Sequence, residues 1–198
     1  MPEGTGGVLD EAVFVESPFC DDRPEGQVPE LVVIHAISLP RGQYLNGNVR
    51  KLFTGAIDPL AHPSFASLEG LRVSSHFFID REGKLFQFVP TNRRAWHAGV
   101  SFYGRRTRVN DFSIGIELEG TDTEPFEEVQ YATLEGLVAK LRDLHPSLAV
   151  VTGHEDVAPG RKTDPGLGFD WERVRNLGLR LWRLGERVQE GRGFFQSR

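Results

Sequence analysis

The sequence contains a single cysteine, Cys20, among its 198 residues. One cysteine excludes an intrachain disulfide and a zinc site built from several thiolates, and this scarcity fits a reducing compartment. Residues 1–16 have neither the basic start nor the apolar stretch of a signal peptide. No uncharged apolar run reaches the roughly 18 residues that a membrane-spanning helix needs. We therefore expect a cytoplasmic protein that does not cross a membrane.

An excess of positive charge is also missing. The formal net charge is -5 and the isoelectric point is near 5.7, so nothing in the overall charge favours nucleic acid or an anionic membrane as a partner. The local basic run at residues 105–108 is more typical of a solvated loop. The oligomeric state is left open, with a monomer favoured.

Length and composition favour one domain with short extensions. The chain is 39% hydrophobic and 26% charged, which is ordinary for a globular protein. Residues 1–28 are rich in glycine, proline and acidic side chains, and we expect an N-terminal arm that packs on the domain. The single domain then spans residues 29–190, and residues 191–198 form a C-terminal tail.

Several segments have the patterns of strands. Residues 31–35 and 149–151 are apolar runs typical of strands that are covered on both faces. Residues 113–119 alternate, with three apolar side chains on one face and Glu117 on the other. Residues 75–80 and 84–89 flank a turn and predict a hairpin, although their pattern does not decide which face is buried.

Helical spacing appears in three places. Residues 49–53 present one short apolar face, and a longer pattern includes Phe126, Val129, Leu134, Leu137, Val138 and Leu141. His145 and Pro146 end that longer helix. A further helical pattern runs from Trp171 to about residue 188. Because strands and helices interleave, we predict an α/β (α+β) fold with a central mixed β-sheet flanked by helices.

The loop at residues 153–166 carries the first chemical signal. Glycines and prolines mark it as an ordered loop rather than a helix or strand, and within it His154 and Asp164 bracket Lys162. An imidazole and a carboxylate suit zinc, but a catalytic zinc site usually takes three protein ligands and a water. His35 is the leading candidate for the third ligand, because it ends an apolar strand; the alternative is a histidine satisfied within the core.

The other polar residues allow two interpretations each. Glu117 either faces a cleft, where it can take a proton from water, or belongs to a solvated strand face with Glu119. Lys162 either stabilises an oxyanion or pairs with Asp164. His62 and His145 lie in contexts typical of the surface, whereas the aromatic neighbours of His76 and His97 are compatible with a cleft.

Five segments in the same order resemble the zinc N-acetylmuramoyl-L-alanine amidases, a superfamily that includes phage T7 lysozyme and the peptidoglycan recognition proteins. The likeness extends from about residue 13 to 175 and is greatest to the cytoplasmic 1,6-anhydro-N-acetylmuramyl-L-alanine amidases of cell-wall recycling, the AmpD type. The matching segments are residues 31–35, 73–77, 94–99, 110–120 and 153–171.

The resemblance implies that His35, His154 and Asp164 bind one zinc ion. It also implies that Glu117 is the general base and that Lys162 stabilises the oxyanion while the amide between N-acetylmuramic acid and L-Ala is hydrolysed. Further positions match substrate-binding residues of the family. Arg72 and Arg108 would hold acidic groups of the stem peptide, and Trp96 and His97 would line the sugar side of the substrate site. The substrate-binding roles of His76 and His97 follow only from their motif positions.

One position departs from the family pattern. Ala36 follows the first ligand, where these enzymes commonly have asparagine, so one hydrogen bond to the substrate is missing or is supplied elsewhere. The alternative function is a non-catalytic module that binds muropeptides. Modules of that kind typically lack a zinc ligand, whereas all three are present in this sequence.

Overall fold

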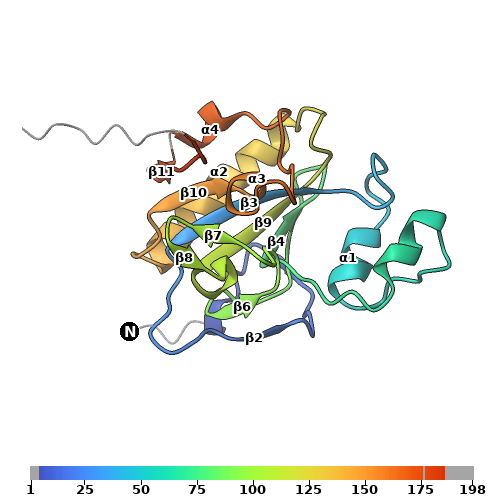
Figure 1. Cartoon of the computed structure of the whole chain (residues 1–198), viewed down its shortest axis with the longest axis horizontal. Coiled ribbons are helices and arrows are strands. Elements are labelled where there is room, and N and C mark those ends of the chain that lie inside the picture. Colours follow the sequence, from blue (N-terminus) through green and yellow to red (C-terminus); the bar gives the residue numbers. More distant parts are fainter. Residues whose placement is uncertain (1–4, 176, 186–198) are drawn as a thin grey trace, which may run out of the picture.

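The structure is a computed structural model that describes residues 5–175 and 177–185. Its centre is a seven-stranded sheet in the order β1-β5-β4-β9-β3-β10-β11 (Figure 1). Only the β4–β5 pair is antiparallel in this sheet, which confirms the predicted mixed sheet. In that order the strands are Val13–Phe14, Leu85–Gln87, Phe77–Ile79, Ser113–Glu119, Leu31–Ile37, Val150–Gly153 and Arg180–Leu181.

Two small antiparallel pairs flank this sheet. β2 (Cys20–Asp22) pairs with β6 (Arg93–Ala95), and β7 (Phe102–Tyr103) pairs with β8 (Arg106–Thr107). The 3-10 turns are η1 (Thr5–Gly7), η2 (Pro63–Leu68) and η3 (Val109–Phe112). The α-helices are α1 (Asn48–Phe53), α2 (Glu128–Leu144), α3 (His154–Val157) and α4 (Trp171–Arg175).

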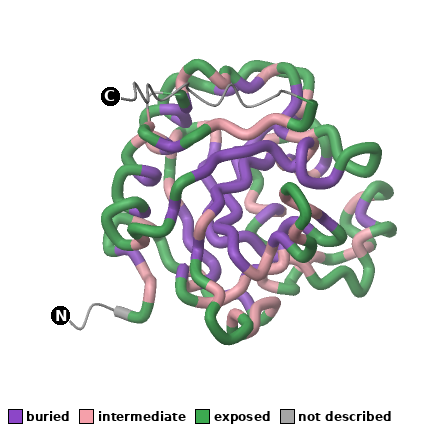
Figure 2. The backbone as a smooth tube through the Cα atoms, turned by 60° about the vertical axis from the view of Figure 1, so that its left-hand side comes forward, coloured by how far each residue is buried: buried purple, intermediate pink, exposed green. Residues whose placement is uncertain are grey.

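The central strands are buried on both faces (Figure 2). Ile114, Ile116 and Leu118 point to the face that α2 covers, and they pack with Leu134 and Val138 of that helix. Burial of these side chains supplies the main stabilisation of the fold. On the opposite face a second cluster includes Leu31, Val33, Phe112 and Val157. All seven residues of β9 are therefore buried, and Glu117 and Glu119 do not lie on a solvated face.

Helix α2 ends where the sequence predicts, and its start is capped. Glu127 and Gln130 form a capping box at its start. At its end, the N–H of His145 donates to the Leu141 carbonyl at 2.8 Å, and Pro146 cannot extend the ladder. One core assignment was wrong, because Val129 is 49% exposed. Helical spacing alone does not reveal how wide the buried stripe is.

The hairpin is also present, and its structure explains the missing alternation. Phe77 and Ile79 pack in the core beneath α2, whereas Phe78 and Phe86, which are paired across the two strands, pack in a separate cluster with α1. Both faces are buried, so a period of two in polarity is not needed.

Two sequence predictions need correction. The helical pattern from Trp171 yields only the five residues of α4, after which Gly178 adopts a φ of 71° and β11 adds to the sheet. Strand pairing replaces the helix here because β10 offers an open edge, at which the Arg180 N–H donates to the Ala149 carbonyl at 2.9 Å. The rest of that predicted helix, beyond residue 185, lies outside the described residues. The loop at residues 153–166 also contains one helical turn, α3.

The N-terminal arm contributes β1 and β2, and Leu9 is part of the main core. Residue 28 as a domain boundary stays a prediction, and the tail at residues 191–198 lies outside the described residues. Within the part of the chain that the structure describes, no helix combines the length and the apolar character needed to cross a membrane.

Candidate active site

Three possible metal ligands meet at the carboxyl-terminal ends of β3 and β10. His35 Nδ1 lies 2.8 Å from His154 Nδ1 and 3.3 Å from Asp164 Oδ2, and His154 Nδ1 lies 3.1 Å from Asp164 Oδ2. Both histidines are buried, and Asp164 is partly buried. The three residues predicted as ligands are therefore grouped around one point.

Strand pairing explains this meeting of residues that are far apart in sequence. Parallel pairing of β3 with β9 sets His35 opposite Glu117. On the other side of β3, Gly153 at the end of β10 lies opposite Ile34, so His154 follows at the same edge of the sheet. Asp164 is brought back to this edge because its carbonyl accepts from the Glu155 N–H at 2.8 Å.

The spacing of these three atoms fits a zinc ion. Two ligand atoms bound at about 2.0–2.1 Å to one tetrahedral zinc are about 3.3 Å apart, close to the separations of 2.8–3.3 Å found here. His154 Nε2 lies 3.3 Å from the Ala98 carbonyl, which can only accept a hydrogen bond. With a metal bound, the proton of His154 would lie on Nε2, facing this carbonyl, and Nδ1 would provide the lone pair that a metal needs.

The protonation states also suit a cation. Burial, followed by the charge of His154, lowers the pKa of His35 to about 4, so the ring is neutral at pH 7. Burial raises the pKa of Asp164, but hydrogen bonds with His154 and His35 outweigh it and hold this pKa well below its ordinary value. Two imidazoles and one carboxylate are a donor set that zinc accepts.

Glu117 lies beside this group and is not a ligand in it. Its Oε1 is 3.9 Å from His35 Nδ1, and the residue is buried. Burial raises the pKa of Glu117 well above its ordinary value; the charge of Asp164 adds to this effect, and the charge of Lys162 opposes it. A carboxylate with a raised pKa is a stronger base, as general base catalysis near neutral pH requires.

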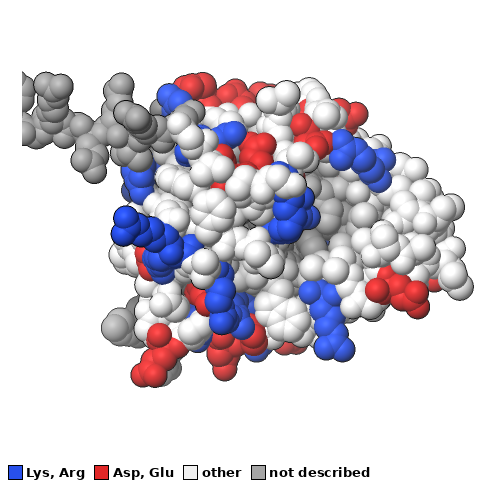
Figure 3. Space-filling view, viewed as in Figure 1, with Lys and Arg blue, Asp and Glu red and all other residues white. Residues whose placement is uncertain are grey.

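A cleft of about 230 Å³ gives access to these residues. Its polar side is formed by His35, Glu117, His154, Lys162 and Asp164, and its apolar wall includes Leu52, Phe53, Leu68 and Leu71 of the α1–η2 region. In Figure 3 the surface is hollowed between the sheet and this region, and lysine and arginine side chains border the hollow. Asp164 pairs with the two histidines, and no ion pair joins it to Lys162 among the described residues.

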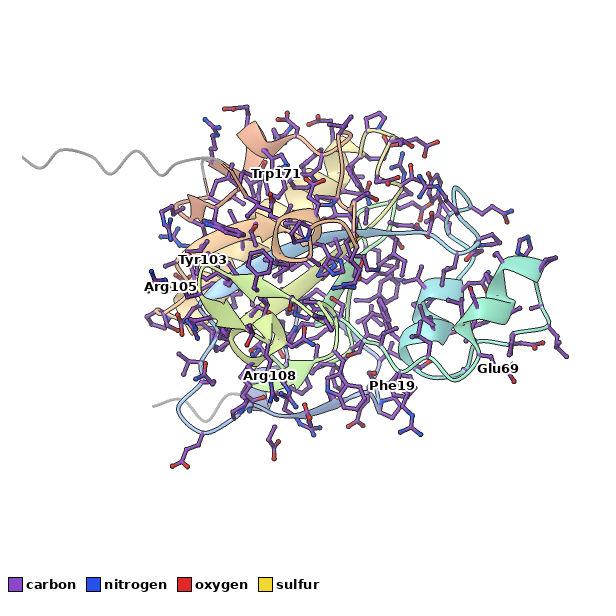
Figure 4. The ribbon with its side chains drawn as sticks, in the orientation of Figure 1. Phe19, Glu69, Tyr103, Arg105, Arg108 and Trp171 are labelled. Atoms are coloured by element: carbon purple, nitrogen blue, oxygen red, sulfur yellow. The ribbon has the colours of Figure 1, made fainter. Side chains whose placement is uncertain are left out.

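The predicted substrate-binding residues are spread over a wider area. His97 lines the cleft. Arg72 is exposed and lines an adjoining cavity of about 150 Å³ that shares Leu68 and Leu71 with the cleft. The indole N–H of Trp96 donates to Asp21 at 3.0 Å, and its ring stacks on Phe19. Arg108 lies beside β6 (Figure 4), exposed, with Nε 3.1 Å from Asp111. Contact of these residues with a substrate stays a prediction.

His76 requires a correction, because it is fully buried and is not among the described residues that line the cleft. Its Nδ1 accepts from the Gly115 N–H at 3.1 Å, and Nε2 lies 3.0 Å from the Arg93 carbonyl. Aromatic neighbours in the sequence indicate burial as readily as a cleft. Direct contact of His76 with a substrate is not compatible with this position.

Sequence reasoning missed the residues that support α3. Asp156 is buried; its Oδ1 accepts from the Leu184 N–H at 2.9 Å, and its Oδ2 lies 3.0 Å from Arg183 Nε. Arg183 also pairs with Glu155 at 2.7 Å. The segment after β11 therefore holds the turn that carries His154. The only signal in the sequence was two carboxylates after His154, without an indication of their cationic partner.

Comparison with known proteins identifies the family. Residues 25–167 match the family model of N-acetylmuramoyl-L-alanine amidase. The chain is 54% identical to the 1,6-anhydro-N-acetylmuramyl-L-alanine amidase AmpD of Escherichia coli over 172 residues, 86% of this chain and 94% of the relative.

Two solved structures place the fold in the same group. A selenomethionine derivative of AmpD is similar with a TM-score of 0.85 and 52% identity, over 87% of this chain and 97% of the other. The amidase AmiD of Escherichia coli, in complex with anhydro-N-acetylmuramic acid-L-Ala-D-γ-Glu-L-Lys, is similar with a TM-score of 0.55 and 28% identity, over 81% and 62% of the two chains. The chain is an amidase and belongs to the N-acetylmuramoyl-L-alanine amidase family.

Proposed function

We propose that this amidase uses one zinc ion, held by His35, His154 and Asp164, to cleave muropeptides in cytoplasmic peptidoglycan recycling. The bond cleaved is the amide between 1,6-anhydro-N-acetylmuramic acid and L-Ala of the stem peptide. The observation that carries the proposal is the convergence of three metal-ligand atoms within 4.8 Å of one another, beside a buried carboxylate in an open cleft. The name of the AmpD relative supports the substrate.

The residues divide the chemistry among them. When bound, zinc would polarise the scissile carbonyl and lower the pKa of a water molecule. Glu117 takes the proton from the attacking water and returns it to the leaving amine. Its raised pKa makes it a stronger base than an ordinary carboxylate and moves the pKa toward neutral pH, which suits a group that must accept the proton and then release it. The Lys162 ammonium lies on the same cleft and stabilises the negative charge that develops on the carbonyl oxygen.

The cleft has a suitable character for a muropeptide, which combines an apolar lactyl–alanyl part with acidic peptide groups. The wall formed by Leu52, Phe53 and Leu71 accepts the apolar part. Arg72, in the adjoining cavity, is positioned for a carboxylate of the stem peptide, which a guanidinium binds in a bidentate manner. The AmiD relative, whose structure contains an anhydromuramyl peptide, supports this substrate class.

A second cavity bears on the departure at Ala36. This cavity has a volume of about 260 Å³, and the ligand Asp164 forms part of its wall. Ala36 borders both this cavity and the cleft. Its other side chains include Arg41, Asp122 and Thr163. These side chains offer hydrogen-bond donors and acceptors. They can therefore bind the polar substrate group that an asparagine at position 36 would bind.

The experiment is incubation of the zinc-loaded chain with 1,6-anhydro-MurNAc-L-Ala-γ-D-Glu-meso-diaminopimelate and, separately, with the non-anhydro compound. Release of the peptide is followed by mass spectrometry. We expect rapid release from the anhydro compound that stops when a chelator removes the metal. Equal cleavage of both compounds would contradict specificity for the anhydro form. Absence of cleavage by a chain with one bound zinc would contradict the proposed reaction.

A further inference from the structure

We propose that His97 is a positioning residue for the metal site, which holds His35 in the tautomer and orientation that a metal ion requires. The inference rests on the proposed zinc site and deepens it. It assigns to His97 a role different from the substrate contact that the sequence predicted. The role follows from a chain of three side chains, His35, His97 and Ser113, which we call the histidine relay.

The relay is continuous and buried. His35 Nε2 lies 2.9 Å from His97 Nδ1, and His97 Nε2 lies 3.0 Å from Ser113 Oγ. His35 is 1% exposed, His97 9% and Ser113 0%. Both ring nitrogens of His97 are thus engaged with protein groups, which leaves the ring no nitrogen for a substrate. The planes of the His35 and His97 rings are 89° apart, so an edge of one ring meets the other.

Metal binding fixes the direction of these hydrogen bonds. A metal at His35 Nδ1 needs the lone pair there, so the proton of His35 must be on Nε2. That N–H donates to His97 Nδ1, which must then be the unprotonated nitrogen. The proton of His97 is therefore on Nε2 and is donated to Ser113 Oγ. A histidine in this position has the same effect as the carbonyl or carboxylate that commonly orients a metal-binding imidazole.

A glycine makes room for the relay. A Cβ atom on Gly115 of β9 would lie 2.5 Å from Cγ and 2.8 Å from Nδ1 of His97, closer than real Cβ contacts come. The His97 ring therefore packs directly on the backbone of β9, between His35 and Ser113. Any larger residue at position 115 must displace the ring. Gly115 is thus a requirement of the relay, and its own backbone is extended like that of the rest of β9.

The test measures zinc affinity of the full chain by competition with a chelating dye. We expect His97→Leu and Gly115→Ala to weaken zinc binding at least about tenfold, as loss of an orienting partner does in other zinc sites. His97→Gln should retain most of the affinity, because its amide oxygen can accept the His35 N–H. Gly136→Ala on α2 is the matched control, since a Cβ there meets nothing within 4 Å.

A second measurement does not depend on any variant. Long-range ¹⁵N–¹H correlation spectra of the zinc-loaded chain report which ring nitrogen carries the proton. We expect His35 and His97 both to be protonated on Nε2. Protonation of His97 on Nδ1 would overturn the proposal, and so would wild-type zinc affinity in the His97→Leu chain. A rise in KM at unchanged zinc affinity would instead return His97 to substrate contact.

These outcomes are separable from failure of the proposed function. If the wild-type chain bound no zinc, the metal site itself would be wrong. If the wild-type chain bound one zinc ion and the relay variants bound it with the same affinity, the metal site would be supported and the relay would be contradicted.

Discussion

At the scale of single residues, two glutamates on one strand show how position decides chemistry. Glu117 and Glu119 are two residues apart on β9, and burial raises the pKa of both. Glu119 accepts the backbone N–H groups of Leu45 at 2.9 Å and Arg81 at 3.1 Å. Glu117 instead faces the cleft beside Asp164 and Lys162. Glu119 is therefore a structural acceptor, and Glu117 is the group left available for proton transfer.

We accordingly predict that replacing each glutamate by glutamine has a different effect: one lowers kcat and the other lowers stability. Glu117→Gln should lower kcat by about 10²–10⁴, the usual contribution of a general base, while zinc content stays at one per chain. Glu119→Gln should retain turnover and lower the free energy of unfolding. Asp164→Ala should lose zinc as well as activity. Steady-state kinetics together with metal analysis test all three, and wild-type kcat in zinc-loaded Glu117→Gln would remove the general-base role.

The sequence identified the proposed ligands, but not the surroundings that make them effective. His35, His154 and Asp164 were recognisable from residue type, strand ends and resemblance. The difference between His97 at the cleft and His76 behind it was not recognisable, because it depends on which backbone groups meet each ring. The Gly115 N–H and the Arg93 carbonyl take up His76, and both come from elements distant from it in the sequence.

At the scale of elements, periodicity was reliable where a segment was long or buried on one side. β3, β9 and α2 appear at the expected places, since their patterns reflect contact with the same core. The prediction of a long helix from Trp171 was wrong, because the apolar spacing of this segment is compatible with either a helix or an edge strand. The neighbouring edge of β10 decides between these states, and that edge is created by the tertiary fold.

Helix α2 gives a prediction that separates true core positions from apparent ones. Leu134 is 1% exposed and Val129 is 49% exposed, although both match the same spacing. We expect Leu134→Ala to lower the free energy of unfolding by about 2–5 kcal/mol, because it leaves a cavity in the main core. Val129→Ala should change it by less than about 0.5 kcal/mol. Urea unfolding measures both, and equal losses would show that Val129 is part of the core.

At the scale of the whole molecule, the N-terminal arm, the sheet and the candidate site form one unit. Arg23 of the arm donates to the carbonyls of Thr91 at 3.2 Å and Ser113 at 2.9 Å, and its Nη2 lies 3.2 Å from His76 Nε2. Burial lowers the pKa of Arg23 to about 10, so it keeps its positive charge at neutral pH. That charge lies beside His76, whose ring in turn packs against His97 of the cleft.

This arrangement predicts how the stability of the metal-free chain depends on pH. Burial, and then the charge of Arg23, holds the pKa of His76 well below its ordinary value. The unfolded chain takes up a proton on this histidine below about pH 6.5, whereas the folded chain does not. The stability from neutral His76 is therefore complete above about pH 6.5 and falls by about 1.4 kcal/mol per pH unit below it.

Comparison with a variant isolates this contribution. The pKa values of His35 and His97 are lowered in the same direction, mainly by burial, whereas Glu117, whose pKa burial raises, acts in the opposite direction. Urea unfolding of the metal-free wild type and of His76→Gln, between about pH 7.5 and about pH 5, should give slopes that differ by about one proton. The variant should be less stable at about pH 7.5 and lose less stability on acidification. Parallel curves would mean that His76 accepts a proton in the folded chain, and the charge of Arg23 would then have no part in keeping the buried histidines neutral.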